Sequence, residues 1–406
     1  MKNGLLSTVA RLLCLGGMIA SGLIASNQAM AADADEVPQF RYDPDWPKQL
    51  PNAWTVGVTG AIYITKDDHI WIAHRPNSIT APSENAALEG LGECCTPDPP
   101  VIEFDTAGNV IQAWGAIHQI KSATLAPSSP YTPGKDVLVG KQVSGPYPDG
   151  VWPMSEHAMF VDYKNNVWLT SQLDPSQVVK FTHDGKLIKL FGEGKEAASS
   201  NDTKNFAGPT AVYVDPQTNE AYISDGYRNR RIIVLDADTG AFKRMWGAYG
   251  KPPKAEQQKT MAGSQKDDFA VTHCVVAAND GLLYVCDRAN SRIQVFKKDG
   301  TYVREVFVGA DKKSTYGNAW FVAFSADKDQ RFLYLADGSN KKIWILRRSD
   351  LKVIGSLGHG GRKGGEFMSI HCLAVDSKGN IYTGETLSGN RIQRFLFTGV
   401  GPASAN

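Results

Sequence analysis

The chain has 406 residues, with 43 Lys and Arg against 42 Asp and Glu, and 42% of it is hydrophobic. This composition excludes a disordered chain, argues against a nucleic-acid binder, and leaves no apolar run of about 18 residues beyond the N-terminus to predict a membrane span. The 39 glycines and 9 tryptophans favour a β-rich fold with many tight turns.

Residues 1–31 have the pattern of a secretory signal peptide. Lys2 and Arg11 stand before or at the edge of a mostly apolar stretch, 12–24, and Ala29 and Ala31 mark a small-residue cleavage pattern. The apolar stretch of about 13 residues is too short to span a bilayer. The sequence therefore predicts an exported protein, periplasmic or secreted, without a membrane span. Its mature chain keeps 41 basic and 42 acidic residues, so charge indicates no partner.

A unit of about fifty residues recurs along the rest of the chain. Its clearest copy has short strands at 209–215, 219–225, 231–236 and 241–247, separated by turns rich in Asp, Asn and Gly. Four antiparallel strands repeated six times predict an all-β, six-bladed β-propeller, and the regular unit disfavours a pair of β-sandwiches. The six units, in chain order, are 57–115 with a break between 75 and 101, 154–192, 209–247, 270–308, 317–358, and one from residue 367 onward.

The last unit ends soon after its third strand, at 391–395. We predict that the N-terminal segment 32–53 supplies the missing outer strand, around residues 39–42, to a propeller that spans 54–406. Long insertions at 76–99, 116–149 and 248–266 predict loops on the faces of the propeller, where binding residues concentrate.

Export would permit disulfides among the five cysteines that follow the signal peptide, although an odd number leaves at least one unpaired. We expect small buried residues, with one bridge as a further option. For Cys94 and Cys95, which lie in a loop rich in Gly and Pro, an ordinary loop pair is favoured over a strained redox bridge. The other three are Cys274, Cys286 and Cys372.

Three histidines lie at the start of the innermost strand in alternate units: His157, His273 and His371. Alternate blades of a six-bladed ring are about 120° apart, so imidazoles at one height converge in the channel. Three neutral histidines with an open fourth position are the ligand set of a catalytic zinc, and we predict such a site. The other histidines are at turns or strand ends, which favours structural or surface roles: His69, His74, His118, His183 and His359.

The ends of the second strands supply neighbours for this site. Arg75 in unit one and Arg288 in unit four hold the same offset in opposite blades, with Gln172 at that offset in unit two. Two guanidiniums facing a channel suit a carboxylate-bearing substrate, and ion pairs with Asp or Glu at the blade rim are the alternative. Tyr227, one step further along in unit three, is either a phenolic base or a rim aromatic.

These residues resemble the lyase domain of peptidylglycine α-amidating enzymes, a propeller of NHL repeats. The most specific stretches are VTG at 58–60 with HR at 74–75, SDGYRNRRI at 224–232 and CDRANSRI at 286–293. The resemblance implies zinc on the three histidines and an active site with Arg75, Arg288 and Tyr227, where Tyr227 takes a hydroxyl proton and the arginines hold a carboxylate. It also implies cleavage of a peptide ending in α-hydroxyglycine into an amide and glyoxylate, with no redox cofactor.

The chain departs from the family pattern at several positions. The family aspartate after the last zinc histidine, linked with a structural calcium, is Cys372 here, and a methionine two positions before that histidine is Ser369. The cysteines of one family disulfide correspond to Ala207 and Arg228. These differences weaken the expectation of calcium and of a peptide substrate more than that of zinc. We expect Cys274 and Cys372 in the blade cores, because adjacent strand residues point to opposite sides.

Two other functions stay open. A non-catalytic NHL propeller would bind a protein partner or ligand, but it has no need of three histidines at matched positions. A lactonase-like hydrolase on a six-bladed propeller requires a calcium site of Glu, Asn and Asp, and the strand starts hold no such set. The sequence therefore predicts an exported, metal-dependent lyase acting on a small carboxylated or peptide-like substrate.

Overall fold

The computed structural model describes residues 36–402 except 88–89, 116–150, 154, 173–175, 261–266, 312–313 and 315. The predicted signal peptide and the whole of the 116–149 insertion lie outside the described residues. Within them the fold is all-β, with four short 3-10 turns: η1 (Pro51–Ala53), η2 (Pro76–Ser78), η3 (Pro82–Glu84) and η4 (Ala248–Gly250). No helix in this part of the chain is long and apolar enough to cross a membrane.

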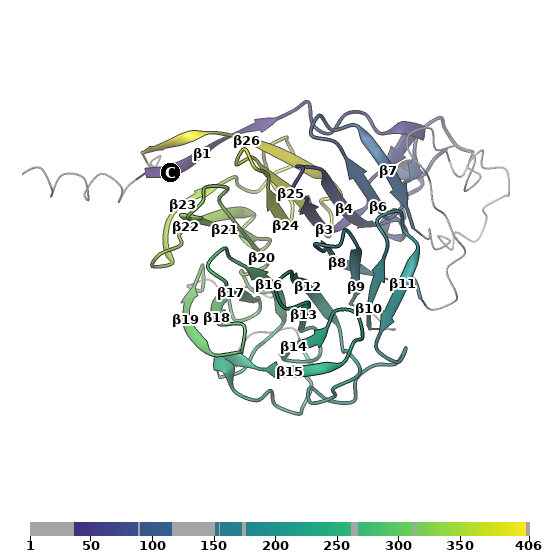
Figure 1. The fold of residues 1–406 in the computed structure, drawn as a ribbon. Coiled ribbons are helices and arrows are strands. Elements are labelled where there is room, and N and C mark those ends of the chain that lie inside the picture. Colours follow the sequence, from purple (N-terminus) through teal and green to yellow (C-terminus); the bar gives the residue numbers. More distant parts are fainter. Residues whose placement is uncertain are drawn as a thin grey trace, which may run out of the picture.

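Six four-stranded antiparallel sheets form a ring, as the sequence predicts (Figure 1). Blades one to three comprise β3 (Val58–Ile64), β4 (Ile70–Arg75), β6 (Val101–Phe104) and β7 (Val110–Trp114); β8 (Glu156–Val161), β9 (Val167–Ser171), β10 (Gln177–Phe181) and β11 (Leu187–Phe191); and β12 (Pro209–Asp215), β13 (Glu220–Asp225), β14 (Arg231–Asp236) and β15 (Phe242–Trp246). Each blade places its first strand nearest the axis of the ring (Figure 1).

Blades four and five repeat this order, and the sixth takes its outer strand from the N-terminal end. They comprise β16 (Thr272–Ala277), β17 (Leu283–Asp287), β18 (Arg292–Phe296) and β19 (Tyr302–Phe307); β20 (Phe321–Phe324), β21 (Phe332–Asp337), β22 (Lys342–Arg347) and β23 (Lys352–Leu357); and β24 (Ile370–Val375), β25 (Ile381–Glu385), β26 (Ile392–Pro402) and β1 (Glu36–Asp43). A separate parallel pair, β2 (Trp54–Thr55) with β5 (Thr96–Pro97), ties the end of the first insertion to the entry of blade one.

The ring closes through the strand predicted around residues 39–42. Strand β1 pairs antiparallel with β26, from Glu36 opposite Pro402 to Asp43 opposite Arg394. The guanidinium of Arg394 donates from Nε to the Asp43 carboxylate at 2.7 Å. Because this blade joins segments from both ends of the described chain, it leaves the ring without an open gap between first and last blades.

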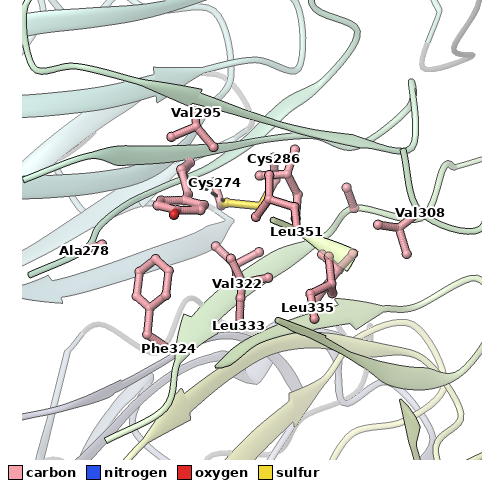
Figure 2. Close-up of a cluster of buried hydrophobic side chains, with 14 residues drawn as sticks. Cys274, Ala278, Cys286, Val295, Val308, Val322, Phe324, Leu333, Leu335 and Leu351 are labelled. Atoms are coloured by element: carbon pink, nitrogen blue, oxygen red, sulfur yellow. Dashed lines mark hydrogen bonds between the residues drawn. A yellow bond between two sulfur atoms is a disulfide. The ribbon is translucent and has the colours of Figure 1, made fainter. Parts of the chain in front are cut away.

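Buried apolar side chains fill the spaces between neighbouring blades. Figure 2 shows one such cluster, in which residues of blade four pack against Val322, Leu333 and Leu335 of blade five. Burial of both faces explains why the inner three strands of each blade are largely apolar, while outer strands such as β11 and β15 are partly exposed to solvent. The packed blades hold the strand starts around the axis in fixed positions.

The cysteines are more extensively paired than the sequence indicates. Cys274 and Cys286 form a disulfide between β16 and β17 within the cluster of Figure 2. Cys94 and Cys95 also form a disulfide, so the preference for an ordinary loop pair was wrong. Cys372 is a buried thiol, and burial raises its pKa to about 12. Both Cys274 and Cys372 lie in blade cores, as expected.

This pairing predicts a labelling pattern. Alkylation of the unfolded but unreduced chain from residue 32 onward should modify one cysteine, Cys372, and all five after reduction. Replacing Cys274 and Cys286 together by alanine should lower the free energy of unfolding by about 2–4 kcal/mol, because the bridge closes a loop in the unfolded chain. Peptide mass spectrometry and urea titration measure the two effects. A Cys372→Ser control should take up no label before reduction. Three labelled cysteines in the unreduced native sequence would contradict the pairing.

Candidate metal centre

A β-bulge occurs near the start of five of the six innermost strands. Pairing with the second strand skips one residue in each of β3, β8, β12, β16 and β24. A bulge leaves its extra residue outside the ladder and re-aims the side chain. The skipped residues are Gly60, His157, Thr210, His273 and His371, and Trp320 directly precedes β20 at the matching place in blade five.

The structure brings the three predicted histidines together. Their ring centroids lie 4.8 Å apart for His157 and His273, 4.9 Å for His157 and His371, and 5.0 Å for His273 and His371. All three are buried, and one nitrogen of each lies within 4.8 Å of the others. This near-equilateral set is the one group of three or more His, Cys, Asp or Glu ligands found among the described residues.

Backbone carbonyls of the next blades set the tautomers. The Nδ1 of His157 lies 2.8 Å from the carbonyl oxygen of Thr210, and the Nδ1 of His273 lies 2.7 Å from that of Trp320. A carbonyl only accepts, so both Nδ1 atoms carry the proton and both Nε2 atoms keep a lone pair. The backbone of Gly60, at the equivalent place in blade one, acts to raise the pKa of His371. The Nδ1 of His371 nevertheless makes no hydrogen bond of good geometry.

The electrostatic environment keeps these imidazoles neutral. Burial lowers the pKa of each one, and nearby positive charge lowers it further. For His371, whose pKa falls to about 3, the further causes are the guanidiniums of Arg75 and Arg288. Neutral imidazoles are the form that binds a metal ion, and backbone carbonyls orient two of the three rings, so this donor set fits zinc.

Tyr227 lies directly against the triad rather than at a distant rim. Its hydroxyl is 3.1 Å from the Nε2 of His157 and 3.5 Å from the Nε2 of His273. The guanidinium of Arg288 donates to the same oxygen at 3.2 Å. The phenolic oxygen therefore lies between two candidate ligands and a fixed cation.

The two arginines lie at the same end of the channel. Arg75 donates from Nε to the carbonyl oxygen of Glu156 at 2.9 Å, and no ion pair with a carboxylate is found for it among the described residues. Arg288 is buried, with its guanidinium 4.7 Å from the ring centre of Trp320 and 5.3 Å from that of Tyr227. Stacking and backbone contacts thus hold both planes in position, which suits binding of a planar anion.

A cavity of about 1120 Å³ opens above the triad. The charged side chains in its described lining are all basic, and none of the described lining residues carries a carboxylate. The cavity therefore favours an anionic ligand with room for a group beyond the anion. Its lining side chains include Arg75, Gln172, Tyr227, Arg228, Gln258, Lys259, Arg288, Tyr316, Trp320, His371, Thr386 and Leu387.

The opposite end of the channel has a different chemistry. A cavity of about 200 Å³ there is lined almost entirely by apolar side chains of the innermost strands, Ile62 and Val375 among them. Cys372 packs in the core between blades six and one instead of facing the axis. Calcium requires several oxygen ligands. Because the described lining offers no carboxylate, these residues do not fit the calcium that the resemblance raised.

Comparison with known proteins agrees with the repeat pattern. The family model for the NHL repeat matches residues 269–296, which include β16 to β18. The chain is a six-bladed propeller that carries an NHL repeat. It is 27% identical to mouse peptidyl-glycine alpha-amidating monooxygenase over 246 residues, which cover 60% of this chain and 23% of that protein.

Two other similarities extend along most of the propeller. Mouse NHL repeat-containing protein 3 is 24% identical over 382 residues, covering 89% of this chain and 85% of that protein. A solved structure entitled "Streptogramin B lyase structure" aligns with a TM-score of 0.47 at 11% identity, covering 90% of this chain and 98% of that chain.

The 248–266 insertion contributes a residue that the sequence did not single out. Gln258 is buried, and its Nε2 donates to the carbonyl oxygens of Gly226 at 2.6 Å and Tyr227 at 2.7 Å. Its Oε1 accepts from the N–H of Val271 at 3.2 Å, just before the strand that carries His273. One amide thus joins the insertion, the Tyr227 loop and the start of β16. No local pattern in the sequence marks this long-range contact.

Removing the side-chain amide of Gln258 should destabilise the propeller. In Gln258→Ala, two buried carbonyls and one N–H lose their partner, so we expect the free energy of unfolding to fall by about 1–3 kcal/mol. Urea unfolding followed by tryptophan fluorescence measures the change. Lys259→Ala removes the neighbouring exposed side chain and should leave the midpoint unchanged. Equal midpoints for Gln258→Ala and the native sequence would contradict the role of Gln258.

A buried pair supports the strand end that carries Arg75. The Nε2 of His74 lies 2.8 Å from the carboxylate of Asp98, and the Nδ1 accepts from the N–H of Gly57 at 3.1 Å. Burial alone would lower the pKa of His74, but Asp98 raises it overall. Asp98 comes from the first insertion. Its contact with His74 therefore supports the end of β4, where Arg75 is the last residue.

The remaining histidines do not join the triad. His69 and His183 both pair with Glu103, at 2.7 and 3.2 Å. His359 is exposed, with its Nδ1 3.1 Å from the carbonyl oxygen of Gly360. His118 lies outside the described residues.

Proposed function

We propose that the protein is an exported, zinc-dependent lyase for a carboxylated carbinolamide, R–CO–NH–CH(OH)–COO⁻, which it splits into an amide and glyoxylate. The observation that carries this proposal is the convergence of three neutral imidazoles with Tyr227 at the base of a cavity whose charged lining is basic. The similarity to amidating monooxygenases adds support, although it covers 23% of the length of the mouse protein.

The proposed reaction balances without an oxidant or reductant. The C–N bond to the carbinol carbon breaks, and the hydroxyl C–O bond becomes the C=O of glyoxylate. The hydroxyl proton is transferred, in net terms, to the departing amide nitrogen. The protein therefore has to bind a carboxylate, remove a proton from oxygen and keep a proton available for nitrogen.

His157, His273 and His371 would hold the zinc ion through Nε2. Bound there, zinc supplies Lewis-acid polarisation of a substrate oxygen. The Nδ1 contacts to the next blades fix the ring planes of His157 and His273, so these side chains need little rearrangement to bind.

The two arginines and Tyr227 have separate roles in the proposed reaction. Arg75 and Arg288 bind the substrate carboxylate from two sides of the channel. Tyr227 acts as a phenolate, whose oxygen accepts the hydroxyl proton and returns it to the nitrogen. Because Arg288 donates to that oxygen, it also stabilises negative charge on Tyr227 while the proton is absent.

Glyoxylate release from N-benzoyl-α-hydroxyglycine tests the proposal. The purified mature protein should release glyoxylate and benzamide in equal amounts, well above a protein-free blank that records spontaneous breakdown. Treatment with a chelator should abolish the release, and zinc should restore it. A rate equal to the blank with zinc-loaded protein would overturn the lyase.

A second candidate is a propeller that binds a protein or ligand without catalysis. It is favoured by the similarity to NHL repeat-containing protein 3, which covers 89% of this chain. In that case the protein binds zinc but releases no glyoxylate. Affinity capture of partners, compared between zinc-loaded and chelated protein, then becomes the relevant measurement.

A further inference from the structure

Gln172 occupies the same structural position as the two arginines. It directly follows β9, as Arg288 follows β17, while Arg75 is the last residue of β4. Its N–H donates to the carbonyl oxygen of Ser155 at 3.3 Å, two residues before His157. The side chain lines the large cavity together with both arginines. Gln172 therefore belongs to the ring of residues that surrounds the triad, although no role is assigned to it above.

Gln172 also lies close to Tyr227. Gly208, at φ +82°, sits between them, and a Cβ built there would come within 2.5 Å of the Cβ of Tyr227 and 3.4 Å of the backbone oxygen of Gln172. This close approach requires glycine, because a side chain would collide with Tyr227. The backbone of Gln172 is thus held within a few ångströms of the loop that carries the proposed base.

The side-chain oxygen of Gln172 has no partner. Its Oε1 is buried and accepts no hydrogen bond from any described residue. By contrast, the amide of Gln258 in the same cavity has partners for both Oε1 and Nε2. Buried polar atoms are nearly always paired, and Gln172 lines the cavity, so its unpaired oxygen can accept a hydrogen bond from a ligand once the side chain turns toward the cavity.

The donor can be identified by elimination among the substrate groups. The substrate carboxylate only accepts, and Arg75 and Arg288 supply its donors. The hydroxyl is directed to Tyr227. The amide N–H is the remaining donor, and the arginines of the cavity cannot accept from it because a guanidinium has no lone pair to offer.

We propose that Gln172 recognises the substrate through its amide N–H, making the cavity selective for secondary N-acyl amino acids over N-alkylated ones. This rests on the proposed function for the identity of the substrate. The hydrogen bond orients the nitrogen next to Tyr227, and it is a specificity contact that forms or breaks no covalent bond itself.

Binding of unreactive analogues tests the inference without turnover. N-benzoylglycine keeps the carboxylate and the N–H, whereas N-benzoylsarcosine carries a methyl group in place of the hydrogen. Calorimetry on zinc-loaded protein should give an affinity about tenfold or more higher for the glycine compound. In Gln172→Leu the preference should shrink to a few-fold or less, because only the steric part of the methyl effect remains. Gln172→Glu keeps an acceptor and should keep the preference.

Gln217→Leu is the matched control, since Gln217 is exposed in the turn after β12. It should retain the native preference. Equal affinities of the native protein for the two compounds, no binding of either, or an unchanged preference in Gln172→Leu would each overturn the role of Gln172. The glyoxylate assay decides the lyase separately: release of glyoxylate together with equal affinities would leave the lyase standing and remove this contact alone.

Discussion

A variant in which His157, His273 and His371 are all alanine is expected to bind no zinc and to lose glyoxylate release by a thousandfold or more, that is about 4 kcal/mol of transition-state stabilisation. The three imidazoles are the only group of three or more clustered metal-ligand side chains among the described residues, so no neighbouring group can replace them. Elemental mass spectrometry of the native protein should give one zinc per chain, and the variant should give none.

Folding of the variant has to be separated from loss of the metal. His371→Ala is the mildest single change, because its Nδ1 makes no hydrogen bond of good geometry whereas those of His157 and His273 do. Added zinc should raise the unfolding temperature of the native protein, since a ligand at 100 times its Kd stabilises the folded state by about 2.7 kcal/mol. It should not raise that of His371→Ala to the same extent.

His359→Ala provides the matched control, because that histidine is exposed and lies outside the triad. It should keep the zinc content and the activity of the native protein. Zinc retained by the triple-alanine variant would place the metal elsewhere and contradict the proposed centre.

The propeller and its triad could be predicted because both depend on short-range order. Each unit carries its own strand and turn pattern, so the start of the innermost strand, where His157 and His371 lie, can be located within each unit. The geometry of a six-bladed ring then predicts the triad, since residues at one height in alternate blades converge on the axis. The closing strand at residues 36–43 follows from the same counting, because one strand was missing from the last unit.

The disulfide in blade four could not be predicted from this short-range pattern. The bulge at His273 shifts the register by one residue and places Cys274 directly opposite Cys286. The bulge at His371 does the same in blade six, but Cys372 meets Gly384 and stays a thiol. Strand pairing across a bulge is not visible in the sequence, so the two equivalent cysteines could not be told apart.

Contacts made by the insertions were also beyond prediction. Asp98 reaches His74 from the first insertion, and Gln258 reaches the Tyr227 loop from the third. Such contacts depend on how a loop folds over a face, which no periodicity encodes. Gln172 is an intermediate case: its offset in the repeat was visible, but its unpartnered oxygen is a property of the folded cavity.

Tyr227→Phe is expected to keep the zinc and lose the chemistry. Phenylalanine fills the same space against His157 and His273, so the native zinc content should persist. Without the phenolic oxygen the hydroxyl proton has no acceptor, and positioned acid–base groups contribute about 10²- to 10⁴-fold. We therefore expect kcat for glyoxylate release to fall within that range, with KM changed by a few-fold at most because Arg75 and Arg288 still bind the carboxylate.

Steady-state kinetics beside elemental analysis separates this outcome from the others. Tyr163→Phe removes the hydroxyl of an exposed tyrosine, paired with Asn219 at 3.0 Å, and should leave both measurements unchanged. If Tyr227→Phe loses zinc as well, the hydroxyl holds the metal or the triad instead of accepting a proton. If it retains full kcat, the base lies elsewhere, and the 3.1 Å contact between Tyr227 and His157 is structural. Only low kcat with full zinc content assigns the proton to Tyr227.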